Sequence, residues 1–150
     1  MPNTNCSIEL WRVLIEGNRE MTQTLTNAIT QRPVKNKDFP CVSIACEYGE
    51  YRAFGHSRKC HKSIRKEFKY VPPLLHGLRQ FAEPPFSGIV KGRLLFVGTC
   101  AEDFSSNQIL ENYMAVHNTY PNLKDLVFTL PVRPRTYQCR DFCEVCNTIF

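Results

Sequence analysis

A chain of 150 residues is long enough for one domain with a modest hydrophobic core and short for several domains. Hydrophobic residues make up 43% and charged residues 22%, the composition of a globular protein, which excludes a disordered or collagen-like chain. The formal net charge of +5 favours an anionic partner such as nucleic acid, although enzymes of neutral substrates can be equally basic.

The first predicted element is an amphipathic helix over residues 7–31. Its apolar side chains recur at steps of three, four and seven residues, which is the spacing of one helix face. They are Ile8, Trp11, Leu14, Ile15, Met21, Leu25 and Ile29. Residues 41–54 then predict a β-hairpin, because strand-like runs stand on either side of Gly49.

A basic insert is predicted over residues 56–90. Its first part, HSRKCHKSIRKEFKY, is rich in lysine and arginine and carries Phe68 and Tyr70 near its end. Such a stretch can follow a phosphate backbone and stack bases, and the alternative is a solvated helix face. LLHGLRQFAE, which stands between two proline pairs, predicts a short helix.

The second half of the chain, residues 91–150, alternates strands and helices. Residues 94–97 predict a short buried strand, 100–117 a helix and 126–130 another strand. A last short helix is predicted from about Cys139. This order predicts the α/β class and a single domain over residues 1–150.

Two short motifs begin the two helices of this half: CAE at residues 100–102 and CEVC at residues 143–146. Cys100, Cys143 and Cys146 would supply three thiolate ligands for zinc, the number that leaves one position for water in catalytic zinc sites. Residues three apart are neighbours on a helix, so C-x-x-C puts both sulfurs on one side. Glu102 would lie beside the water and carry its proton to a leaving amine. The sequence therefore predicts residues 91–150 as the core of a hydrolytic zinc site.

The charge of such a site has to be offset. Three thiolates leave a zinc site with a net charge of about −1, which weakens zinc as a Lewis acid. A nearby cation or N–H donors to sulfur would compensate. Arg133, Arg135 and Arg140 lie in or just past the loop before C-x-x-C and are candidates, with solvated loop arginines as the alternative.

A structural zinc site is the main alternative. Cys139 precedes Cys143 by four residues and could complete a closed set of four thiolates, which has no open position for water. Such a module would bind nucleic acid or protein without catalysis. It would give no role to Glu102.

The two motifs resemble the signature of the zinc-dependent cytidine and nucleic-acid deaminase superfamily, [H/C]-A-E and P-C-x-x-C, each at a helix start after a strand. The resemblance covers most of the chain in the order of elements, and the two motifs by residue. It implies a three-layer α/β/α fold with a small mixed sheet, from which the strands that follow the last helix are absent. It also implies Cys100, Cys143 and Cys146 as Zn²⁺ ligands and Glu102 as proton shuttle, in hydrolysis of the amidine C–N bond of a base.

The sequence departs from the family pattern at two places, and the second bears on the substrate. Phe142 stands where the signature has proline, and GHSRKCHKS stands where free-cytidine enzymes carry an N-x-E substrate motif. The second departure favours cytosine in single-stranded or flipped DNA or RNA, with His56 and Ser57 as candidate contacts. A free cytidine or nucleoside deaminase is the alternative enzyme.

The cysteines also bear on the compartment. The eight cysteines would suggest disulfides in a short secreted chain. The first residues show no basic start followed by an apolar run, so no signal peptide is expected. No stretch nears the roughly 18–20 apolar residues of a membrane span, so no membrane partner is expected. We expect an intracellular protein of the cytoplasm or nucleus, with an exported toxin module as the alternative.

Overall fold

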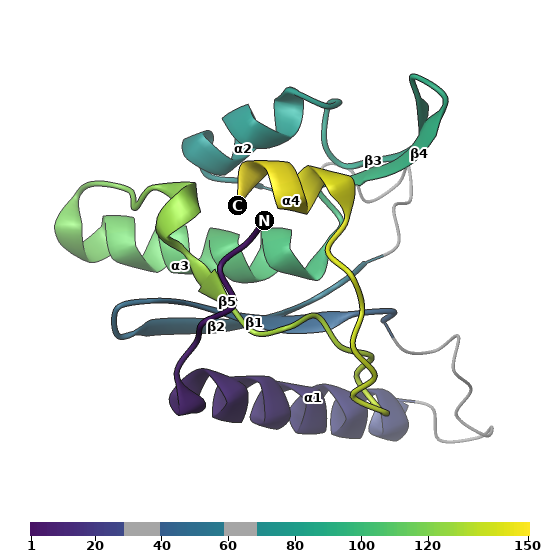
Figure 1. The fold of residues 1–150 in the computed structure, drawn as a ribbon. Helices are drawn as coiled ribbons and strands as arrows, with labels where there is room; N and C mark the ends of the chain where they lie inside the picture. Colours follow the sequence, from purple (N-terminus) through teal and green to yellow (C-terminus); the bar gives the residue numbers. More distant parts are fainter. Residues whose placement is uncertain (29–39, 59–68) are drawn as a thin grey trace.

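The computed structural model describes residues 1–28, 40–58 and 69–150. Two predicted segments therefore lie partly outside the described residues: the end of the first helix, at 29–31, and the basic stretch at 59–68. The described part is a mixed α/β arrangement of helices around a small antiparallel sheet (Figure 1). Within it, no helix is both long and apolar enough to cross a membrane.

The main sheet has the strand order β2-β1-β5. β1 (Ser43–Tyr48) and β2 (Tyr51–His56) form the predicted hairpin, in register from Ser43 opposite His56 to Tyr48 opposite Tyr51. β5 (Val127–Phe128) pairs antiparallel with β1 on the other side. The expectation of a mixed sheet is wrong for these strands, since parallel pairing is confined to an isolated bridge between Asn3 and Val127.

One face of the sheet is covered by α1 (Ile8–Ala28), the predicted N-terminal helix. Leu10 and Leu14 pack with Ala45 of β1 and Val132 in one hydrophobic cluster. The buried face of α1 is narrower than its sequence suggests, because Ile8 is 72% exposed.

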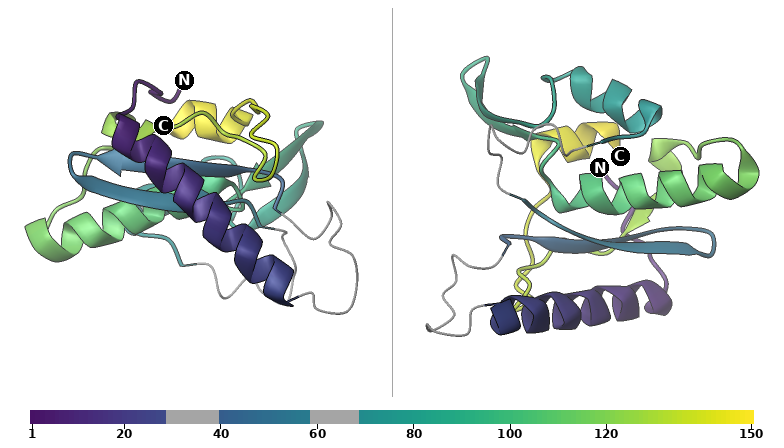
Figure 2. Two further views of the ribbon diagram at one scale, coloured as in Figure 1. Left: turned by 90° about the horizontal axis from the view of Figure 1, so that it is seen from below. Right: turned by 180° about the vertical axis from the view of Figure 1, so that it is seen from behind.

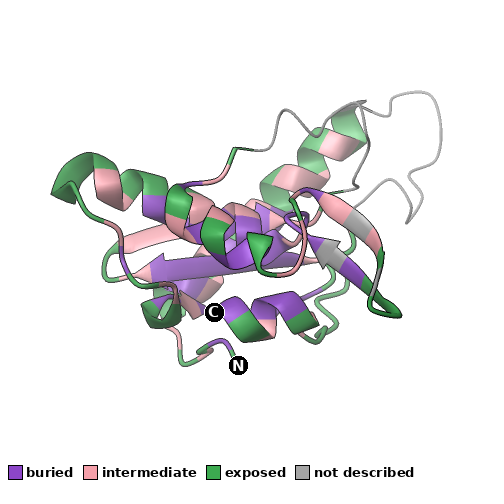
Figure 3. Ribbon diagram, turned by 90° about the horizontal axis from the view of Figure 1, so that it is seen from above, coloured by how far each residue is buried: buried purple, intermediate pink, exposed green. Residues whose placement is uncertain are grey.

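The other face carries α3 (Ala101–His117) and α4 (Glu144–Ile149), so that helices, sheet and helix form three layers (Figures 1 and 2). Because side chains alternate along a strand, Ile44 and Cys46 face away from Ala45 and join a second, larger cluster. That cluster includes Ile109 of α3 and Val145 of α4. Figure 3 shows buried residues gathered along β1 and the parts of α3 and α4 that face it.

The contact between α3 and the sheet depends on a glycine. A Cβ atom at Gly55 of β2 would lie 2.3 Å from the carbonyl oxygen of Ala101 and 2.7 Å from the amide nitrogen of Ser105. Both distances are far below van der Waals contact. The first turn of α3, which begins directly after Cys100, therefore rests against the backbone of β2.

The predicted strand at 94–97 exists but does not join this sheet. β4 (Arg93–Val97) pairs antiparallel with β3 (Phe86–Val90) in a separate hairpin, next to α2 (Pro72–Arg79). Leu95 and Val97 are buried, whereas Leu94 is 62% exposed, so the expectation of full burial is wrong. In a two-stranded ribbon only one face meets the core, and alternate side chains face solvent.

The predicted last helix begins five residues later than expected. A short 3₁₀ turn, η3 (Leu123–Asp125), precedes β5, and α4 starts at Glu144. Cys139 instead forms an isolated antiparallel bridge with Val132, which also bridges to Ser43. The segment between β5 and α4 reaches past the sheet to the α1 layer before it returns (Figure 1).

Candidate metal centre

The three motif cysteines meet where α3 and α4 begin. Cys100 is the N-cap of α3 and Cys143 the N-cap of α4, both with extended backbone, and Cys146 lies in the first turn of α4. Hydrophobic contacts of α3 and α4 in their shared cluster hold the two helix starts together.

The sulfur positions suit a metal ion. The Sγ atoms of Cys100, Cys143 and Cys146 all lie within 4.8 Å of one another, and those of Cys100 and Cys143 are 3.5 Å apart. Zinc–sulfur bonds of about 2.3 Å in a tetrahedron place sulfurs about 3.8 Å apart. The three sulfurs could therefore hold an ion with small shifts, and an all-thiolate donor set suits zinc.

The loop before Cys100 is fixed by contacts that the sequence did not reveal. Gly98 has a left-handed φ of +80°, and a Cβ there would lie 2.6 Å from Cβ of Pro84. The Tyr70 hydroxyl donates to the Gly98 carbonyl, and the backbone N–H of Arg58 donates to the Thr99 carbonyl at 3.0 Å. Both ends of the predicted basic stretch thus attach to the two residues before Cys100.

Asp103 holds the backbone of Cys100 itself. Its Oδ2 accepts the Cys100 N–H at 3.2 Å, and its side chain is fully buried. Burial raises the pKa of the Asp103 carboxyl well above its ordinary value. The available sequence signal was an acidic residue three positions after an N-cap, which is the spacing of a capping box.

The three thiol groups differ in their pKa values. Hydrogen bonds from Cys100 and Cys146 to the Cys143 sulfur lower the pKa of Cys143 to about 3. The hydrogen bond with Cys143 raises the pKa of Cys100 well above the ordinary thiol value. Hydrogen bonds with Cys100 and Cys143 do the same to the pKa of Cys146. The Cys146 N–H also donates to the Cys143 sulfur at 3.4 Å. Such an N–H donor to sulfur would partly offset the negative charge of three thiolates.

The Glu102 carboxyl group lies beside the sulfurs and is buried from bulk solvent. The residue is 4% exposed, and burial raises the pKa of its carboxyl to about 7, with the negative charge of Cys143 adding to the effect. A hydrogen bond with Cys146 acts in the opposite direction. A carboxyl group with a pKa near neutrality can both accept and return a proton.

Of the two candidate substrate contacts, His56 ends strand β2 and Ser57 directly follows it. The Ser57 Oγ accepts the Val42 N–H at 3.0 Å, and the Ser57 N–H donates to the Val42 carbonyl at 2.8 Å. Burial lowers the pKa of His56, whose Nδ1 lies 3.2 Å from the Ser57 carbonyl oxygen. Ser57 thus has a structural role in closing the hairpin, and contact of either residue with substrate stays a prediction.

The three candidate arginines are exposed. Arg133 follows Val132, whose side chain belongs to the cluster on the α1 face of the sheet, whereas the cysteines belong to the cluster on the opposite face. The Arg140 N–H donates to the Pro131 carbonyl at 2.8 Å. The role of Arg133, Arg135 and Arg140 beside the metal ligands stays a prediction.

Cys139 lies outside the sulfur cluster. The described residues whose ligand atoms gather within 4.8 Å are Cys100, Cys143 and Cys146, and Cys139 is exposed on the segment that leads to α4. The geometry therefore offers three sulfurs with a buried carboxyl group beside them. Compared with known proteins, the chain matches no family model, no curated protein and no solved structure.

Proposed function

We propose that this protein is a zinc-dependent deaminase that hydrolyses the amine from a nucleobase, most simply cytosine to uracil in single-stranded or flipped nucleic acid. The observation that carries the proposal is the buried Glu102 beside three sulfurs within 4.8 Å of one another. A purely structural zinc site needs no carboxyl group there, and a buried carboxyl group costs stability.

Each residue has a role in this proposal. Cys100, Cys143 and Cys146 would hold the ion, and zinc bound to them would supply the Lewis acidity that brings the pKa of a water towards neutral. Glu102 accepts the proton of the attacking water and returns a proton to the leaving amine. Its pKa of about 7 matches both steps at neutral pH.

The surroundings of the cysteine loop favour a nucleic acid over a free nucleoside. The Arg58 guanidinium lies over the Phe104 ring, with Cζ 4.3 Å from the ring centroid. The centroid of the Tyr70 ring lies 6.4 Å from that of Phe104. Cations and aromatic rings together bind phosphates and stack bases. Arg58 and Tyr70 both hydrogen-bond to the two residues before Cys100, so these groups lie beside the loop that leads to the first proposed ligand.

The test is one deamination assay on four substrates: cytidine, single-stranded DNA, duplex DNA and RNA. We expect the zinc-loaded protein to form uracil in a single-stranded polynucleotide. Glu102→Gln keeps the size of the side chain and removes its acid–base function, so the rate should fall by about 100-fold or more at equal zinc content. A rate that is unchanged in Glu102→Gln, or a zinc-loaded protein inert on every substrate, would overturn the proposal.

A further inference from the structure

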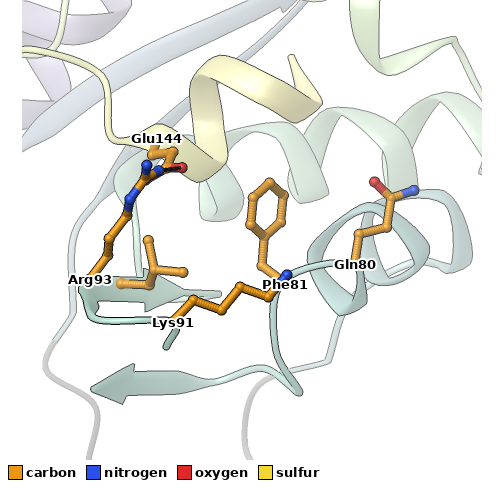
Figure 4. A pocket seen from close by; sticks show the side chains of 6 residues that line it. Gln80, Phe81, Lys91, Arg93 and Glu144 are labelled. Carbon is orange, nitrogen blue, oxygen red and sulfur yellow. Dashed lines mark hydrogen bonds and ion pairs between the residues drawn. The ribbon is translucent and has the colours of Figure 1, made fainter. Parts of the chain in front are cut away.

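A pocket of about 380 Å³ lies between the end of α2, the β3–β4 hairpin and the start of α4 (Figure 4). Its lining residues are Gln80, Phe81, Lys91, Arg93, Leu95 and Glu144. The volume falls at the lower end of the roughly 300–1,000 Å³ of small-ligand sites. None of these residues belongs to the proposed zinc centre, but Glu144 directly follows the ligand Cys143.

The floor and the rim of this pocket differ in chemistry. Leu95 is buried, and Phe81 packs partly against the main hydrophobic cluster, with its ring pointing into the space (Figure 4). Lys91 and Arg93 come from the hairpin, and Glu144 pairs with the Arg93 guanidinium. Two cations face one carboxylate, so the rim carries a net positive charge over an apolar floor.

Lys91 occupies a position that its backbone does not favour. Lys91 and Gly92 form the two-residue turn of the hairpin, with φ values of +50° and +75°. Such turns favour Asn-Gly, because both residues need positive φ. The lysine side chain extends across the pocket towards Gln80 and Phe81 (Figure 4). The residue at this turn therefore brings a cation to the pocket at the expense of backbone preference.

We propose that this pocket binds one nucleotide unit, with the phosphate against Lys91 and Arg93 and the base against the Phe81 ring. A phosphate needs cations, which Lys91 and Arg93 supply at the rim, where the Arg93 guanidinium also pairs with Glu144. A base needs an apolar face, which Phe81 and Leu95 supply, and the Gln80 amide can both donate to and accept from a base edge. The inference rests on the proposed function only in taking the unit as part of the substrate strand, next to the reacting base.

The test measures binding without turnover. The probe is a fluorescein-labelled oligothymidylate of about ten nucleotides, within the ~4–16 nucleotides that single-strand sites span, and its thymine bases carry no amine to remove. Anisotropy titrations of the zinc-loaded full chain are run at several salt concentrations. Free thymidine monophosphate is titrated in parallel, so that a free nucleotide and a unit within a strand are distinguished.

We expect Lys91→Asn, which suits the turn, to weaken oligothymidylate binding several-fold and to reduce the salt slope by about 0.7, the loss of one phosphate contact. Phe81→Leu should weaken binding about tenfold, since stacking contributes ~1–3 kcal/mol per base. Arg12→Gln removes the same charge from the exposed side of α1, across the sheet, and should change neither quantity beyond a small uniform effect.

Equal binding by wild type, Lys91→Asn and Phe81→Leu would overturn the proposal. If the variants lose thymidine monophosphate as well as the oligonucleotide, the pocket takes free nucleotides, and if they lose only the oligonucleotide, it takes a unit of a strand. Uracil formation is read separately. If the protein binds through this pocket but does not deaminate, only the proposed function is contradicted. If it deaminates without using the pocket, only this inference is contradicted.

Discussion

The Sγ atoms of Cys100 and Cys143 lie 3.5 Å apart, although 43 positions separate the two residues in the chain. Each is the N-cap of its helix, so their proximity follows from the packing of α3 and α4 against one shared cluster. Cys146 completes the set from the first turn of α4. Metal binding and the meeting of the two helix starts should therefore depend on each other.

Serine in place of any one of the three cysteines should reduce zinc affinity by about 100-fold or more, because each thiolate supplies a large share of the binding free energy. Zinc content after dialysis against a weak chelator measures this effect. Cys139→Ser is the matched control and should retain one zinc ion per chain, since Cys139 lies outside the sulfur cluster. Loss of zinc in Cys139→Ser would instead favour a closed, four-sulfur site.

In the metal-free protein, Cys143 should react with iodoacetamide at a nearly constant rate from about pH 5 to 8. Its pKa is lowered to about 3, so the thiolate persists throughout this range and is lost only as the pH falls through that value. A small reference thiol with a pKa of ~8.5 should slow about tenfold per pH unit. Peptide mass spectrometry identifies the modified residue. A tenfold decline per unit at Cys143 would contradict the account, and added zinc should protect the residue.

Gly55→Ala should destabilise the fold by about 1–3 kcal/mol, because the new methyl group would lie 2.3 Å from the Ala101 carbonyl oxygen. Urea denaturation followed by circular dichroism measures the change. Gly77→Ala is the matched control within helix α2, where a Cβ meets its nearest atom at 3.5 Å. That change should be neutral or stabilising by up to ~1 kcal/mol, since alanine is the better helix former. Equal effects at the two positions would argue against the close contact.

Glu47→Ala should destabilise the protein by about 1.5–3 kcal/mol, the range for hydrogen bonds to a charged group. The Glu47 carboxylate accepts the Ser7 N–H at 2.9 Å, the Ser7 hydroxyl at 2.6 Å and the Arg52 Nε–H at 3.1 Å, and so holds the start of α1 against β1. Glu50→Ala, in the exposed turn of the same hairpin, should change the free energy of unfolding by less than ~0.5 kcal/mol. Similar losses in the two variants would count against this role of Glu47.

The sequence predicted the elements whose pattern is local. Helical periodicity indicated 100–117, and the structure has Ala101–His117. The strand expected over 126–130 shortens to Val127–Phe128, because the Thr129 hydroxyl accepts the Ala45 N–H in place of a ladder carbonyl and Pro131 has no N–H to donate. Residues 94–97 pair with β3 across the two-residue turn at Lys91 and Gly92, both of which have positive φ. Lysine is not a residue that such turns favour, so the turn carries no clear hairpin signal in the sequence.

At the candidate metal centre, too, the sequence indicated what depends on local spacing and missed contacts between distant residues. Spacing and residue type indicated Cys100, Glu102, Cys143 and Cys146, because the chemistry requires those groups near helix starts. The sequence did not indicate the contact of Tyr70 with Gly98, since it joins residues 28 positions apart. Asp103 was visible only as an acid three residues after an N-cap. The supporting contacts were thus harder to predict than the ligands that they support.

The proposed function depends on a zinc centre with three sulfur ligands and an open fourth position beside Glu102. X-ray absorption spectroscopy at the zinc edge of the zinc-loaded protein tests it most directly. We expect three sulfurs at about 2.3 Å from zinc and one lighter atom, oxygen or nitrogen, at about 2.0 Å. The lighter ligand should persist in Cys139→Ser. Four sulfurs in the wild type, or no bound zinc at one equivalent, would contradict the claim.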